Sequence, residues 1–181
     1  MTQRNPITTK KGDQGFSSLF SGEKISKNSP RMEAIGDVDE LISILGLARA
    51  HAPKSETKDA ILALQRVLFT VGAELATTKE KLERLSQRID LDAVNHIEAL
   101  MDSTPAAATG FKGFVLPGST PVSSYLDYAR SVARRCERGA VGLLETEEIT
   151  NKHLIVWLNR LSDYLYLLAR SDEDNPTYLK E

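Results

Sequence analysis

"PVSSYLDYARSVARRCERGAVGLLE", residues 121–145, decides the fold, because small and apolar side chains recur in it every three or four positions. That spacing is typical of one face of an α-helix that is buried against other helices. The stripe consists of Val122, Tyr125, Ala129, Val132, Cys136, Ala140 and Leu143. Arginines and acidic residues occupy the other side of the segment. The stretch therefore predicts an amphipathic helix that packs in a helical domain.

Four further segments show the same periodicity, and no stretch shows a convincing strand pattern. Their apolar stripes run from Ala34 to Ala48, Ile61 to Leu75, Val94 to Met101 and Leu154 to Leu168. Such stripes become buried by packing against one another, as in an antiparallel bundle. We predict an all-α, single-domain, five-helix antiparallel bundle over residues 31–171 of a domain spanning 1–181. Residues 1–30 would form an N-terminal arm and residues 172–181 a C-terminal tail.

Composition excludes several classes of partner. The chain has 181 residues, with 23 Lys and Arg against 25 Asp and Glu, a net charge of −2 that attracts neither nucleic acid nor an anionic membrane. The single cysteine allows no intrachain disulfide, which fits a reducing compartment. No signal peptide is visible at the N-terminus, and no apolar run approaches the roughly 18 residues of a membrane span. We expect a cytoplasmic protein whose anion site, if it has one, is a local concentration of positive charge.

Two segments do not fit a bare bundle. Residues 1–30 are rich in glycine, hydroxyl residues and lysine, and contain neither a Walker A loop nor a dinucleotide fingerprint. By default this arm is flexible, although its glycines would also let backbone N–H groups converge on an anion. Residues 102–121 form a connection of unusual length, and such loops are functional or disordered. Apolar side chains argue against disorder there: Phe111, Phe114, Val115 and Leu116.

The polar side of residues 121–145 has two interpretations. Helical geometry places Arg130, Arg134 and Arg138 in one sector with Asp127 and Glu137. The group could be a solvated stripe of ion pairs. It could also bind a polyanion, because the planar guanidinium donates two parallel hydrogen bonds to phosphate.

Two other polar positions are equally open on spacing alone. Asn159 lies beside the last apolar stripe, either satisfied by a neighbouring side chain or hydrogen-bonded to a base or ribose. Cys136 has arginine neighbours that would lower its pKa, but its place on the apolar stripe favours a buried residue. The three histidines show no metal-ligand spacing.

Five blocks match a known family in order and spacing: "TKKGDQGFSSLFSGEKISK", "EAIGDVDEL", "FVLPG", "RSVARRCER" and "LNRLSDYLYLLAR". Over residues 8–170 the chain resembles the PduO-type ATP:cob(I)alamin adenosyltransferases. The resemblance implies a homotrimeric five-helix bundle that binds ATP and cobalamin between neighbouring subunits and uses Mg2+ with ATP. The implied reaction transfers the 5′-deoxyadenosyl group of ATP to cob(I)alamin and releases inorganic triphosphate.

The resemblance also assigns roles to residues. It implies a nucleotide-wrapping arm formed by Thr9, Lys10, Lys11, Gly12, Ser17, Ser18 and Lys27. It implies further ATP contacts from Arg134, Arg135, Glu137, Arg138 and Asn159. Asp39 and Arg130 match a pair that bridges subunits near the cobalamin. Phe114 matches an aromatic residue that crowds out the lower ligand of the cofactor and leaves cobalt four-coordinate. Together with Arg134, these last three are the expected catalytic residues.

The sequence departs from the family pattern in two places. Ser119 follows Gly118 where a second glycine is common, and Gly139 follows the "RRCER" block where an arginine is common. The reaction implies a cob(II)alamin reductase and an adenosylcobalamin-dependent enzyme as partners, and no nucleic acid or membrane. Two rival interpretations are a carrier that binds ATP or adenosylcobalamin with little turnover, and an interaction bundle whose arginines are only surface. The second leaves the arm and the apolar loop unexplained.

Overall fold

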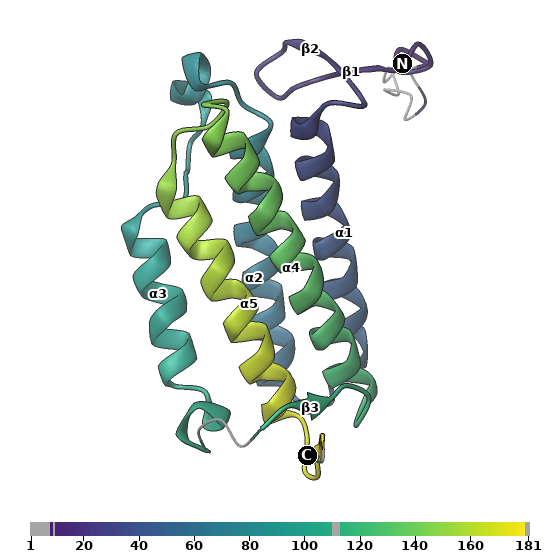
Figure 1. Ribbon diagram of the computed structural model, residues 1–181, viewed down its shortest axis with the longest axis vertical. Coiled ribbons are helices and arrows are strands. Elements are labelled where there is room, and N and C mark those ends of the chain that lie inside the picture. Colours follow the sequence, from purple (N-terminus) through teal and green to yellow (C-terminus); the bar gives the residue numbers. More distant parts are fainter. Residues whose placement is uncertain (1–7, 9, 110–112, 180–181) are drawn as a thin grey trace, which may run out of the picture.

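The computed structural model describes residues 8, 10–109 and 113–179. Five α-helices run side by side and alternate in direction (Figure 1), which confirms the predicted helical bundle. They are α1 Pro30–His51, α2 Ser55–Leu75, α3 Leu91–Asp102, α4 Pro121–Glu145 and α5 Lys152–Ser171. Two short 3-10 helices, η1 (Lys79–Arg84) and η2 (Pro105–Thr109), lie in the connections. No helix of the described chain is long and apolar enough to cross a membrane.

Helix α4 is central, because it packs against both α1 and α5. Its predicted stripe is buried except for Tyr125, which is partly exposed and lies with its ring 5.1 Å from that of His51. Cys136 is 1% exposed, and burial raises the pKa of its thiol to about 12. The thiol is therefore protonated at neutral pH, which confirms the prediction that this cysteine is a buried core residue.

Short strands correct the prediction of a bundle without them. Strands β1 (Phe16–Ser18) and β2 (Lys24–Ser26) form an antiparallel hairpin. Strands β3 (Val115–Leu116) and β4 (Thr177–Tyr178) pair antiparallel between the long loop and the C-terminal tail. Segments of two or three residues are too short to show the alternation by which strands are predicted. In addition, the partner of β3 lies about 60 residues later in the sequence, after α5.

Two buried charges fasten the end of α2 to the rest of the bundle. Arg31, 4% exposed, donates to the carbonyl oxygens of Leu75 (2.7 Å) and Thr77 (3.3 Å) and to Glu148. Glu74, 2% exposed, accepts hydrogen bonds from Arg88 and Asn151 and from the backbone N–H of Ile89; these contacts measure 3.0, 2.8 and 3.1 Å respectively. The end of α2 is thereby tied to the start of α1, to the connection before α3 and to the start of α5.

Replacement of Glu74 by alanine should therefore destabilise the folded protein. Glu74→Ala removes the shared acceptor: the buried Ile89 N–H loses its partner, and the Asn151 amide loses one of its two acceptors. We expect the free energy of unfolding to fall by about 3 kcal/mol. Urea unfolding followed by circular dichroism measures this, with the exposed Glu80→Ala as the control, expected within about 0.5 kcal/mol of wild type. A Glu74→Ala protein as stable as the control would contradict the fastening role.

Candidate functional site

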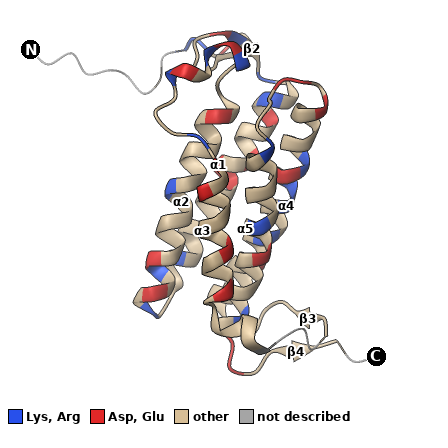
Figure 2. Ribbon diagram, turned by 90° about the vertical axis from the view of Figure 1, so that its left-hand side faces the viewer, with Lys and Arg blue, Asp and Glu red and all other residues tan. Residues whose placement is uncertain are grey.

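The N-terminal arm lies at one end of the bundle (Figure 2). It contains a hollow of about 580 Å³. Its lining consists of Lys11, Gly12, Phe16, Ser17, Ser18, Lys24 and Lys27. The lining contains no carboxylate, and none of its three lysines forms an ion pair with another described residue. The Lys24 ammonium lies over the Phe16 ring, 4.4 Å from its centroid. Unpaired cations, hydroxyls and open backbone around one hollow provide the donors that an anion requires.

At Gly12, a side chain would crowd Lys27. A Cβ atom there would lie 2.9 Å from the Lys27 ammonium nitrogen, so glycine is what lets this lysine lie across the turn. The backbone N–H of Lys27 in turn donates to the Gly15 carbonyl at 2.9 Å. Gly15 has φ +80°, which a larger residue rarely adopts. The two glycines therefore shape the hollow and position its lysine.

The structure brings most of the predicted arm residues together. Lys11, Gly12, Ser17, Ser18 and Lys27 line the same hollow. Lys10 is exposed and outside the lining, and Thr9 lies outside the described residues. The sequence analysis missed Phe16 and Lys24, whose contact depends on the β1–β2 pairing; without that hairpin, no signal in the sequence joins them.

A second positive surface follows α4. Arg134 and Arg138 are exposed, and no carboxylate of the described chain pairs with either. Between them, Glu137 accepts a hydrogen bond from the Asn159 amide at 3.0 Å, and Arg160 donates to the Asn159 carbonyl oxygen at 2.9 Å. A stripe of solvated ion pairs would have engaged these two arginines, so their free guanidinium groups favour the anion interpretation.

Arg134 also lines a groove of about 370 Å³ between α4, α5 and the end of α3. The groove is lined by Met101, Arg130, Arg134, Ser162, Asp163, Tyr166 and Leu167. It shares no lining residue with the arm hollow, so one chain presents two separate surfaces for the predicted ATP contacts.

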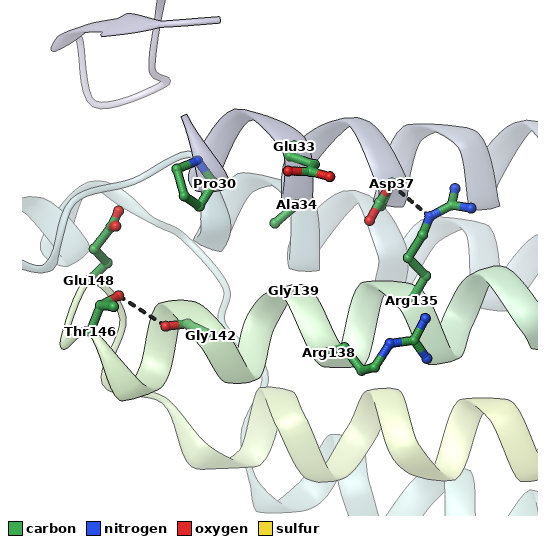
Figure 3. Close-up of a pocket in the computed structure, with 10 residues that line it drawn as sticks. All are labelled: Pro30, Glu33, Ala34, Asp37, Arg135, Arg138, Gly139, Gly142, Thr146 and Glu148. Carbon is green, nitrogen blue, oxygen red and sulfur yellow. Dashed lines mark hydrogen bonds and ion pairs between the residues drawn. The ribbon is translucent and has the colours of Figure 1, made fainter. Parts of the chain in front are cut away.

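Arg135, by contrast, points toward α1 (Figure 3). It donates to Asp37 at 2.9 Å and pairs with Glu40, which also accepts from Tyr128. Burial alone would lower the pKa of Arg135, but the hydrogen bonds and charge of the two acids raise it on balance. Within one chain this predicted ATP ligand thus joins α4 to α1.

A groove of about 420 Å³ lies between α1 and α4. The close approach of the two helices accounts for Gly139, one of the two departures from the family pattern. Gly139 lines the groove, and a Cβ atom there would lie 3.4 Å from the Ala34 Cβ atom (Figure 3). Position 139 therefore faces α1 at close range, where a small residue lets the two helices approach.

The predicted pair of Asp39 and Arg130 is not formed within the chain. Asp39 is exposed on α1, whereas Arg130 lies 3.5 Å from the buried carboxylate of Asp127. Asp127 also binds Arg170 at 2.7 Å, and Arg170 binds Glu173 at 2.8 Å. Although burial by itself lowers the pKa of Arg170, these two acids raise it well above its usual value. The Asp39 contact stays a prediction for an assembly of subunits.

Apolar side chains gather at the end of the bundle opposite the arm. Phe114 is 73% exposed, and its carbonyl oxygen accepts from the Leu179 N–H at 2.8 Å beside the β3–β4 pair. The exposed apolar group consists of Phe114, Leu116, Tyr178 and Leu179. Ser119, the second departure, is exposed and follows Gly118, which has φ +123°. Phe111, also predicted for this cluster, lies outside the described residues.

A row of arginines on α4 lies between the arm end and the β3 end of the bundle. The arm hairpin β1–β2 lies beyond the start of α1, and β3 lies at the opposite end of the bundle (Figure 1). Between them, Arg130, Arg134 and Arg138 follow one another by single helical turns over about 12 Å of the axis. No three His, Cys, Asp or Glu side chains of the described chain gather closely enough to hold a metal ion.

Comparison with known proteins agrees with this geometry. The family model described as cobalamin adenosyltransferase matches residues 7–172. A corrinoid adenosyltransferase of Citrobacter freundii is 39% identical over 170 residues, covering 94% of this chain and 96% of the relative. A variant PduO-type ATP:co(I)rrinoid adenosyltransferase of Lactobacillus reuteri, complexed with ATP, superposes with a TM-score of 0.87 at 29% identity, covering 97% and 100% of the two chains. A second variant from that organism, complexed with cobalamin and ATP, gives 0.81 at 31% identity with the same coverage. The chain belongs to the PduO-type corrinoid adenosyltransferase family.

Proposed function

We propose that this protein transfers the 5′-deoxyadenosyl group of ATP to cob(I)alamin. A cobalt–carbon bond forms at C5′, the C5′–oxygen bond breaks, and its electron pair leaves with inorganic triphosphate. The observation that carries the proposal is the arm hollow, with three lysines that no carboxylate neutralises, in a chain of this family. Solved relatives bound to ATP and to cobalamin support the identity of both substrates.

The cationic groups would act on the leaving group. As the C5′–oxygen bond breaks, negative charge grows on the triphosphate, and preorganised cations stabilise that charge in the transition state. The arm lysines and the unpaired Arg134 and Arg138 supply such groups. Cob(I)alamin is itself a strong nucleophile, so the protein needs no general base and contributes orientation. Magnesium would be bound mainly by phosphates and water, since the described chain offers no carboxylate cluster.

The apolar end suits the other substrate. Exposed apolar surface that clusters on a protein marks a site of binding. Phe114 and its neighbours would contact the corrin ring, and the phenyl ring would exclude water or a ligand from the lower face of cobalt. Reduced cobalt prefers fewer axial ligands, so a dry lower face would favour formation of the nucleophile.

A second copy of the chain would complete the site. The arm hollow and the Arg134 groove share no residue, and the arm and Phe114 lie at opposite ends of one bundle. In a cyclic homotrimer, the arm of one subunit can meet the α4–α5 face of its neighbour, and Asp39 can meet the neighbour's side of α4. A cob(II)alamin reductase and an adenosylcobalamin-dependent enzyme would act before and after it.

Arg134 should contribute to the chemical step. Arg134→Ala removes a free guanidinium from the developing charge, and we expect kcat/KM for ATP to fall by at least about 10²-fold. An anaerobic absorbance assay with ATP, magnesium and reduced cobalamin measures this. The matched control is Arg66→Ala, an exposed arginine on α2, which should keep wild-type kinetics. Wild-type kcat/KM in Arg134→Ala would remove this residue from the mechanism, and ATP binding without turnover in the wild type would favour the carrier interpretation.

Phe114 should control the coordination of cobalt. Phe114→Ala opens the lower face, so we expect the four-coordinate cob(II)alamin spectrum in the ATP complex to be lost and kcat to fall by about tenfold or more. ATP affinity should not change, because Phe114 does not line the arm hollow and its proposed contact is with the corrin ring. The control is Phe69→Ala, because Phe69 is 67% exposed, close to the 73% of Phe114. An unchanged cob(II)alamin spectrum in Phe114→Ala would exclude the role.

A mixing experiment tests whether sites form between subunits. Lys27→Met damages the arm and Arg134→Ala damages the α4 face, so each variant alone should lose activity. Co-expression should restore activity to roughly one quarter of the sites. Half of the arms and half of the neighbouring faces are intact, and random assortment brings two intact partners together in about one site of four. Each variant co-expressed with itself is the control. No recovery in hybrids that assemble normally would place both residues in a site within one chain.

A further inference from the structure

The tip of the arm hairpin, Leu19–Glu23, is held against the segment that follows α2. Ser21 is 1% exposed, and its backbone N–H donates to the Ala76 carbonyl at 3.4 Å. Its hydroxyl accepts from the Thr78 N–H at 3.2 Å and donates to Glu23. A short polar residue at the tip of an exposed hairpin is therefore buried by contact with residues 76–78.

Two cations from η1 converge on the same residue. Lys81 Nζ donates to the Ser21 carbonyl oxygen at 3.1 Å, and Arg84 donates to it at 3.0 Å. Lys81 also forms an ion pair with Glu23. The hydrogen bond from Lys81, together with the Ser21 hydroxyl, lowers the pKa of Glu23 to about 2, so this carboxylate is ionised throughout the neutral range.

The hairpin has little else to hold it in place. Its strands have three residues each, and an isolated hairpin of that size is marginal in water. Leu19 is 6% exposed and Ile25 is partly buried, but Phe16 and Phe20 are 41% and 65% exposed, so only one of the four large apolar side chains is fully buried. The polar contacts of Ser21 are thus the main link between the tip and the bundle.

The surface that receives the tip is itself hydrogen-bonded to the start of α1. The buried Arg31 donates to the carbonyl oxygens of Leu75 and Thr77, next to the residues that bind Ser21. The link therefore runs from the hairpin tip through residues 75–84 to the start of α1. These contacts connect the arm to the bundle at a point outside the hollow.

We propose that Lys81, with Arg84 and Ser21, positions the nucleotide arm: it holds the hairpin in place so that the triphosphate meets a preformed hollow. The inference rests on the proposed function of the arm. Lys81, Arg84 and Ser21 do not line the hollow, so they act through the hairpin rather than by contact with ATP. Without the link, the hairpin would have to be ordered when ATP binds, and that entropic cost weakens binding.

Lys81→Met tests the proposal in the full-length protein. We expect KM for ATP to rise by about tenfold, while kcat at saturating ATP and KM for cobalamin stay within about twofold of wild type. Hydrogen exchange of free protein should accelerate at the amides of Leu19, Ser21 and Gly22, whose acceptors lie in the tip or on Ala76. Lys81→Arg should restore both readouts. Lys79→Met, an exposed lysine on the same short helix, is the matched control and should change neither.

A hollow variant separates failure of this inference from failure of the proposed function. If Lys27→Met raises KM for ATP and Lys81→Met does not, the arm binds nucleotide but Lys81 does not position it. If neither variant changes KM for ATP, the arm has no role in nucleotide binding, and both statements fall. A loss of kcat in Lys81→Met with unchanged hydrogen exchange at the tip would also overturn the positioning role, because it would place Lys81 in the chemical step.

Discussion

The end of α2 is held in place by two buried side chains of opposite charge. Arg31 reaches it from α1, and Glu74 belongs to α2 itself. Arg31 satisfies the carbonyl oxygens that the last turn leaves free, and Glu74 collects donors from the connection to α3 and from the start of α5. A helix end buried without such partners would be unfavourable. The arm end of the molecule depends on these contacts, because the hairpin tip lies against residues 76–78, which follow the end of α2.

Helix α4 is the second constraint on the site. Consecutive positions on it serve different neighbours: Arg134 faces an open groove, Arg135 binds acids of α1, and Cys136 is packed in the core. A helix that meets neighbours on several sides is rigid, and rigid elements hold reacting groups in better register than loops do. The arm and the Phe114 loop are loops, and each is fastened by contacts to a distant segment.

Periodicity predicted the helices well because burial of one face is a property of each segment alone. The stripe from Leu41 and Leu45 to Ala48 needs no knowledge of the partner helix, and the same holds for the burial of Cys136. The strands were not predicted, since β3 forms only because residues 177–178 return to it. Spacing could place Asp127 on the arginine face but not show that Arg170 would bury it. The α4 arginines and the arm glycines were found from residue type, whereas the contact of Phe16 with Lys24 needed the fold.

The long-range fastening of both loops has a consequence for synthesis. Lys81 lies 60 residues after Ser21, and Tyr178 lies 63 residues after Val115 (178 − 115). At roughly 5–20 residues per second, a nascent chain needs about 3–12 s to produce either fastening segment after its loop has been made. The hairpin can dock only when η1 has left the ribosome. The Phe114 loop likewise gains its strand partner only after residues 177–178 have been made, so this end of the bundle is completed after all five helices have been translated.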